Sequence, residues 1–184
     1  MNAVFPFDRL KAAESASEFI RLAGGKISVL KLVKLMYLLD RESLKERNIP
    51  VVGGEYFSMP HGPVTSEVLN SINHERGEGG GHWSELISKR SVWREVRAIH
   101  QSSNENLSPY ELSMIQRLHD QHKSRNKYQL RDWCHVNCKE YEEIFSGRLP
   151  IKIEVLASQI DRTAGEIESS AKEAMFMQSI FAAA

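Results

Sequence analysis

The segment 29–47, VLKLVKLMYLLDRESLKER, most strongly limits what this chain can fold into. Over three turns its apolar residues point in nearly every direction around a helix, and Ser28 offers an N-cap hydroxyl just before it. A helix that is apolar on all sides must be covered by other elements. The sequence therefore predicts a helical domain around one long buried helix, with Leu35 and Leu38 in the core.

Capping patterns predict several further helices. A side chain that can cap a helix N-terminus precedes a run of apolar residues at helical spacing, often with Glu or Gln three residues later. The helix starts predicted in this way follow Asp8, Ser108, Asn126 and Thr163. The first of these helices is expected to end at Gly24 and Gly25, which favour a left-handed C-terminal cap.

A smaller part of the chain favours β structure. Residues 55–64, EYFSMPHGPV, predict a short extended piece with a tight turn at Gly62, after which Pro63 suits the first position of a helix. Residues 84–102 mix Trp, Val and Ile with charged residues, which favours a strand or hairpin that pairs with residues 56–59. The expected class is mainly α (α+β), with a small β-hairpin or short antiparallel sheet. No repeat or linker divides the chain, so residues 1–184 are expected to form a single domain.

Charge and composition argue against several functional classes. Lys plus Arg and Asp plus Glu both number 24, so the chain lacks the overall basic character of many nucleic-acid-binding domains, although one local basic face remains an alternative. The N-terminal residues lack the pattern of a secretory signal, and no stretch approaches the ~20 apolar residues that a membrane span needs. Two cysteines one helical turn apart fit free thiols. We expect a soluble, cytoplasmic protein.

The sequence contains no phosphate loop, dinucleotide fingerprint, nucleophile elbow or HExxH motif, so neither an enzyme nor a cofactor is predicted. The strongest alternative is a zinc site from two helix-borne groups of potential ligands. Their spacing is not that of a zinc knuckle, and neighbouring polar residues favour partly solvated faces, so no metal is predicted. The residues of this cluster are His119, His122, Cys134, His135 and Cys138.

Other side chains leave two interpretations open. Lys31 and Lys34 could hold an acidic ligand, but lysine stems commonly cover apolar surface while the amine stays in water, and we expect solvated amines here. Trp83 and Trp93 are either core anchors or interface residues. The apolar end SIFAAA predicts a fraying helix, with a handle for a protease as the alternative.

Two stretches together resemble a known family. They are residues 26–72, which contain KLVKLMYLLD and YFSMPHGPVTSEV, and a looser part with LSPYELSMIQRLHDQH, YQLRDWCH and RLPIKIEVLA. This combination resembles the Panacea domain of SocA-like antitoxins, also found in phage-associated proteins. The helix after Thr163, residues 163–184, lies outside the family pattern. The matching motif positions are Lys31, Leu32, Lys34, Leu35, Tyr37, Asp40, Tyr56, Met59, Gly62, Pro63, Val64, Ser66 and Glu67.

The resemblance implies an antitoxin that neutralises a cognate toxin protein by direct binding, in some members as an adaptor that hands the toxin to the protease ClpXP. It brings no catalytic residues. The hairpin-like segment is the candidate partner-binding site, with Pro60 and His61 at its tip as preferred contacts, whereas packing is the expected role of most of Tyr56, Met59 and Val64. The alternatives are a helical DNA-binding regulator and a zinc-dependent enzyme. The candidate segment comprises Tyr56, Met59, Pro60, His61, Gly62, Pro63 and Val64.

Overall fold

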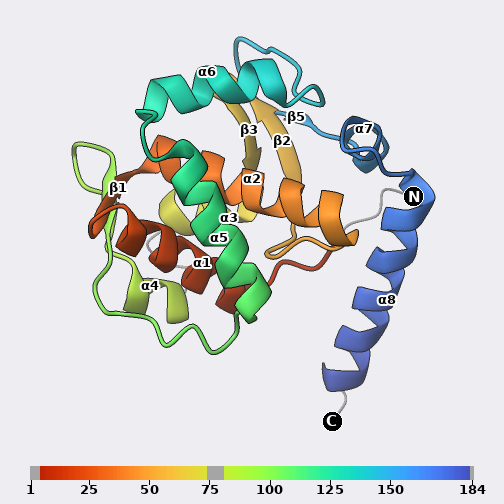
Figure 1. Ribbon diagram of the computed structural model, residues 1–184, viewed down its shortest axis with the longest axis horizontal. Helices are drawn as coiled ribbons and strands as arrows, with labels where there is room; N and C mark the ends of the chain where they lie inside the picture. Colours follow the sequence, from red (N-terminus) through yellow and green to blue (C-terminus); the bar gives the residue numbers. More distant parts are fainter. Residues whose placement is uncertain (1–4, 74–80, 183–184) are drawn as a thin grey trace.

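The computed structural model describes residues 5–73 and 81–182 of the chain. These residues form a mainly α-helical structure with short antiparallel strands (Figure 1). The helices are α1 (Arg9–Leu22), α2 (Val29–Arg47), α3 (Ser66–Asn73), α4 (His82–Leu86), α5 (Pro109–His122), α6 (Lys127–Asn137), α7 (Ile153–Gln159) and α8 (Ala164–Ala182). The strands are β1 (Lys26–Ser28), β2 (Tyr56–Met59), β3 (Gly62–Thr65), β4 (Glu95–Arg97) and β5 (Leu149–Pro150). The fold class expected from the sequence is confirmed.

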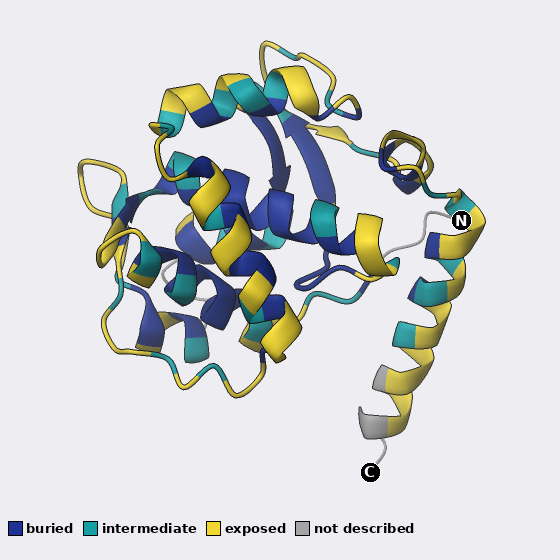
Figure 2. Ribbon diagram, viewed as in Figure 1, coloured by how far each residue is buried: buried dark blue, intermediate teal, exposed yellow. Residues whose placement is uncertain are grey.

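Helix α2 lies in the middle of the molecule and is largely buried (Figure 2). It contacts α1, α3, α5, α6, β1 and β3. The hydroxyl of Ser28 accepts from the backbone amide of Lys31 at its start, and Asn48 adopts a left-handed conformation at its end. These two caps fix the ends of the helix that the sequence predicted.

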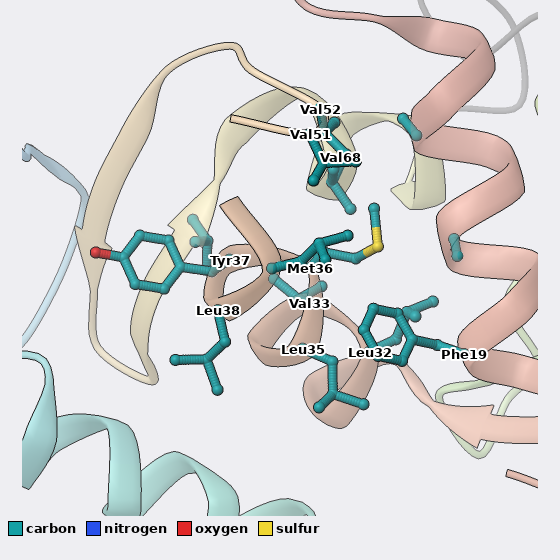
Figure 3. Packing of buried hydrophobic residues seen from close by; sticks show 14 of the residues in the cluster. Phe19, Leu32, Val33, Leu35, Met36, Tyr37, Leu38, Val51, Val52 and Val68 are labelled. Carbon is teal, nitrogen blue, oxygen red and sulfur yellow. The ribbon is translucent and has the colours of Figure 1, made fainter. Parts of the chain in front are cut away.

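The core is built on the apolar surface of α2. Leu35 and Leu38 are almost completely buried, as the pattern predicted. Figure 3 shows Phe19 of α1 beside Leu32 and Met36 of α2, with side chains of α3 and of the turn after α2 on the other side. Because every neighbouring element contributes to this cluster, the position of α2 determines the positions of segments far from it in sequence.

The predicted helix starts are confirmed. Asp8 accepts from the amide of Lys11, Ser108 and Glu111 form a reciprocal capping box, and Asn126 caps α6. The hydroxyl and amide of Thr163 both donate to Glu166 at the start of α8. Local side chains satisfy the free amides at these helix ends, which is why sequence alone could place them.

The predicted strand pairing for residues 84–102 is wrong. This region begins with the short helix α4, and its strand β4 pairs with β1, aligning Ile27 with Val96. Strand β2 instead pairs with β3 on one side and β5 on the other. The choice of partner depends on tertiary packing, since α1 contacts both β1 and β4, and no local pattern encodes this.

The assignment of Pro63 to the start of a helix is also wrong. Gly62, with φ at 93°, closes a hairpin whose two loop residues are Pro60 and His61, and the chain returns as β3 before α3 begins at Ser66. β3 is an edge strand of its sheet, where proline is tolerated because one side of the strand needs no ladder donor.

Helix α8 lies at the edge of the molecule and contacts mainly α7 (Figure 1). Ile167 and Ala171 are buried, whereas Met175, Phe176 and Ile180 are exposed. The last two residues of the apolar end SIFAAA lie outside the described residues. None of the helices in the described part is long and apolar enough to cross a membrane.

A candidate partner-binding groove

Four polar side chains of the motif helix α2 each bond to a different later segment. They follow one another at intervals of three residues: Lys31, Lys34, Tyr37 and Asp40. Lys31 donates to the carbonyl oxygens of Lys123 (3.2 Å) and Arg125 (2.6 Å), so it holds the turn between α5 and α6.

Lys34 departs from the expectation of a solvated amine. Its side chain is fully buried, and its Nζ donates to the carbonyl oxygen of Pro63 at 2.7 Å. Burial lowers the pKa of this amine to about 7, because the charged form has lost its hydration. Gly62 is required beside it: a Cβ there would lie 3.1 Å from this Nζ, and its φ of 93° is one that L side chains rarely adopt. Lys34 therefore fixes the start of β3 against α2.

Tyr37 ties α2 to the segment after α6. Its hydroxyl donates to Glu140 at 2.7 Å, and the guanidinium of Arg41 donates to the same carboxylate at 2.8 Å. Glu140 is buried, so the ion pair supplies the charge partner that a buried carboxylate needs. Burial raises the pKa of the Tyr37 hydroxyl, and the nearby charge of Glu140 raises it further.

Asp40 organises the turn that leads into β2. Its carboxylate is fully buried and accepts from the amides of Val52 (2.7 Å) and Gly53 (3.1 Å) and from the hydroxyl of Tyr56 (3.0 Å). Burial raises its pKa to about 7, although these hydrogen bonds oppose the shift. The motif residues of α2 are thus internal anchors that set the position of the β2–β3 hairpin.

The tip of this hairpin is held from two sides. Lys34 binds the carbonyl of Pro63 from below, and the hydroxyl of Tyr141 donates to the carbonyl of Met59 at 3.2 Å. Between these anchors, His61 is exposed and Pro60 is half-buried. The two residues preferred as contacts are therefore at the tip, as predicted, and their backbone is fixed before any partner arrives.

The remaining candidates divide by exposure. Met59 is half-buried, whereas Tyr56, Gly62, Pro63 and Val64 are buried. Tyr56 points into the core, where it meets Tyr37 edge-to-face at 5.8 Å between ring centroids. The packing role expected for most of these residues fits Tyr56, while Met59, Gly62 and Val64 also line an open groove beside the hairpin.

This groove has a volume of about 770 Å³. Its apolar wall is formed by α2, the hairpin and α3, through Val29, Leu30, Val33, Val64 and Leu69. Its other lining comes from the loop 88–94, the start of α6 and the loop before β5. Segments far apart in sequence meet here: α2 contacts α3, α6 and β3, and the amide of Val29 donates to the carbonyl of Arg94 at 2.9 Å.

The charged lining of the groove has one sign. The basic side chains that line it are Lys34, Arg90, Arg94, Lys127 and Arg148, with His61 at the tip. Among the described residues no Asp or Glu lines it. Within residues 5–73 and 81–182, no carboxylate forms an ion pair with Arg90, Arg94, Lys127 or Arg148. These four side chains, called the rim below, therefore have no ion-pair partner among the described residues.

The His and Cys cluster has a different character from the one expected. His119 and His135 are half-buried, as expected, whereas His122, Cys134 and Cys138 are buried. His122 packs edge-to-face on Trp133. Both cysteines are free thiols, as predicted. In the described part of the chain, no group of three or more His, Cys, Asp or Glu side chains is placed to hold a metal ion.

The two tryptophans left open by the sequence have separate roles. Trp83 of α4 is buried in the core, whereas Trp93 is 79% exposed in the loop that supplies Arg90 and Arg94 to the groove. Sequence reasoning did not select any of the three arginines of the groove: Arg90 and Arg94 lie in a loop without a motif, and Arg148 lies in the looser part of the family pattern. Their shared groove appears only after the chain has folded.

Comparison with known families assigns the chain. Residues 32–140 match the family model described as Antitoxin SocA-like, Panacea domain. The match covers more than half of the chain and includes most of α2, the hairpin, α3, α5 and α6. The protein belongs to the SocA-like antitoxin family and carries its Panacea domain. Comparison with curated proteins and with solved structures gave no match.

Proposed function

We propose that this protein is an antitoxin that neutralises a cognate toxin protein by direct, non-catalytic binding through the groove beside the β2–β3 hairpin. The observation that carries the proposal is the position of this groove. The family-motif residues Lys34 and Asp40 serve to place the hairpin, and the groove lies along that hairpin. A motif that builds a fixed surface, with no catalytic constellation in it, fits a binding protein.

The character of the surface supports a protein partner. The groove combines an apolar wall with arginines, and the exposed Trp93 and Tyr128 lie in the segments that line it. Trp, Tyr and Arg are the residue types that most often dominate binding energy at protein interfaces. A concave, mainly apolar site also differs from the protruding helix with which helical regulators enter a DNA groove.

The test is co-expression with the protein encoded by the adjacent reading frame. Rescue of growth together with a complex that survives purification is the expected result, and a harmless neighbour or the absence of a complex would contradict the proposal. Repeating the rescue experiment in cells that lack ClpX distinguishes direct neutralisation from delivery of the toxin to the protease ClpXP. Direct neutralisation predicts rescue in both strains, whereas loss of rescue without ClpX would assign the effect to proteolysis.

A further inference from the structure

We propose that the groove recognises an acidic segment of the toxin, in which carboxylates flank at least one large apolar side chain. This inference rests on the proposed antitoxin function and specifies the chemistry of the partner at the same site. It rests on three features of the groove: its apolar wall, its basic rim and the fixed position of its hairpin.

The apolar wall of the groove indicates that the centre of the toxin segment is apolar. Leu30 of α2 and Leu69 of α3 are half-buried and line the groove together with the buried Val33 and Val64. A volume of about 770 Å³ is within the range of pockets that enclose several side chains. Covering this wall with apolar groups removes it from water and stabilises a complex by roughly 25 cal/mol per Å² of apolar surface buried. A purely polar or charged segment would leave this surface without a matching contact.

The basic rim of the groove indicates the charge of the residues that flank the apolar side chain of the toxin segment. Arg90 donates to Asn73 at 2.9 Å, and Arg148 donates to Ser66 at 3.3 Å while it stacks over the ring of Phe57. These neutral contacts orient the guanidinium groups, and no carboxylate of the described residues forms an ion pair with either of them. Arg94 and Lys127 add two further positive charges from other segments. Carboxylates are the protein groups that pair with such guanidinium and ammonium groups most strongly.

The floor of the groove explains why its shape does not depend on the partner. Lys34 is bound to Pro63, and the hairpin tip is also fixed by Tyr141. A preformed site loses little conformational entropy on binding, so its charges act on the partner without a rearrangement. The loop that carries Arg90 and Arg94 adds Val92 and Trp93, both highly exposed, next to the rim. The contact area therefore extends beyond a small molecule and fits a peptide segment.

The experiment reverses two rim charges that make few contacts of their own. Arg94→Glu/Lys127→Glu changes the charge of two separate segments that line the groove, and a glutamate at the first position of α6 is compatible with the helix dipole. The matched control is Lys139→Glu/Lys172→Glu, which changes the net charge equally at two exposed positions that do not line the groove. Thermal unfolding of both variants verifies that they are folded.

Binding of the purified toxin from the adjacent reading frame is then measured between 50 and 300 mM NaCl, a range chosen around physiological ionic strength. The inference predicts an affinity about 10- to 100-fold weaker for the groove variant, a flatter salt dependence, and little change for the control. If the toxin binds wild type and both variants equally, this inference is overturned while the antitoxin function stands. If wild type binds no toxin, the proposed function itself fails.

A peptide array of the toxin sequence, in overlapping 15-residue segments, identifies the bound segment. Capture of acidic segments with a large apolar residue, lost with the groove variant, supports the inference. Capture of basic segments overturns it. Two other results also overturn it, provided that the toxin binds elsewhere. One is selective binding of a peptide of residues 164–182 in the groove, and the other is selective binding there of duplex DNA from upstream of the gene.

Discussion

The buried amine of Lys34 makes the stability of the protein depend on pH in a way that can be calculated. Its pKa is about 7 in the folded protein, against 10.5 for a free lysine. The unfolded chain therefore binds more protons between these values, and the free energy of unfolding rises as pH increases from 7 towards 10.5. Each pH unit in this window is worth up to about 1.4 kcal/mol.

The perturbation is Lys34→Met, which keeps a long flexible side chain and removes the ionisable group. The lost hydrogen bond leaves the Pro63 carbonyl without its donor and costs about 1–3 kcal/mol at every pH. The difference between pH values is separate from that cost. From pH 7 to 9, wild type should gain about 2 kcal/mol relative to the variant, since the amine is only half protonated at pH 7 in the folded state.

Urea unfolding at pH 7, 8 and 9, followed by tryptophan fluorescence under reducing conditions, measures this difference. Lys45→Met is the control, because Lys45 is exposed on the same helix. The control should follow the pH dependence of wild type. Parallel stability curves for wild type and Lys34→Met over this range would refute the reasoning, because they would show that the folded protein holds the Lys34 amine at its ordinary pKa.

Three further predictions concern the core, the buried carboxylate and the C-terminal helix. Leu35→Ala should lower the free energy of unfolding by about 2–5 kcal/mol in urea titrations. A neutral effect would contradict the position of α2 in the core. The pKa of Asp40 is raised to about 7 from 3.8, so the folded state binds more protons in this window and stability falls as pH rises through it. Relative to Asp40→Asn, wild type should lose about 2 kcal/mol between pH 5 and 7, and no relative loss would contradict the burial of this carboxylate. Deletion of residues 164–184 removes few buried contacts, mainly those of Ile167 and Ala171. Calorimetry should therefore show a folded protein that is destabilised by no more than about 3 kcal/mol. A chain that no longer unfolds cooperatively would show that α8 belongs to the core.

Local signals made the helices of this protein predictable. The capping residues Asp8, Ser108 and Asn126 act within three residues of themselves, and the apolar surface of α2 is visible in its own sequence. The strand pairing was not predictable in this way. Strand β4 has three residues, and its partner β1 lies about seventy positions earlier, so only the packed helices decide that they meet.

The candidate site also has features that local sequence signals predict and features that depend on tertiary packing. The hairpin tip at Pro60 and His61 could be predicted because a glycine turn leaves a local pattern. The burial of Lys34 could not be predicted. Its sequence neighbours are those of an ordinary amphipathic lysine, and its partner Pro63 was expected to start a helix and not to lie in a strand. The basic rim combines Arg94 and Arg148 from two loops with Lys127 from the start of α6, so it exists only in the folded chain.

The most direct test of the central claim uses purified components without a protease. The toxin from the adjacent reading frame is assayed for its own activity while this protein is added in increasing amounts. Direct neutralisation predicts that inhibition is complete at a fixed stoichiometric ratio and that the inhibited species elutes as a complex of the two proteins. Full toxin activity in the presence of excess protein, with no complex formed, would contradict the account.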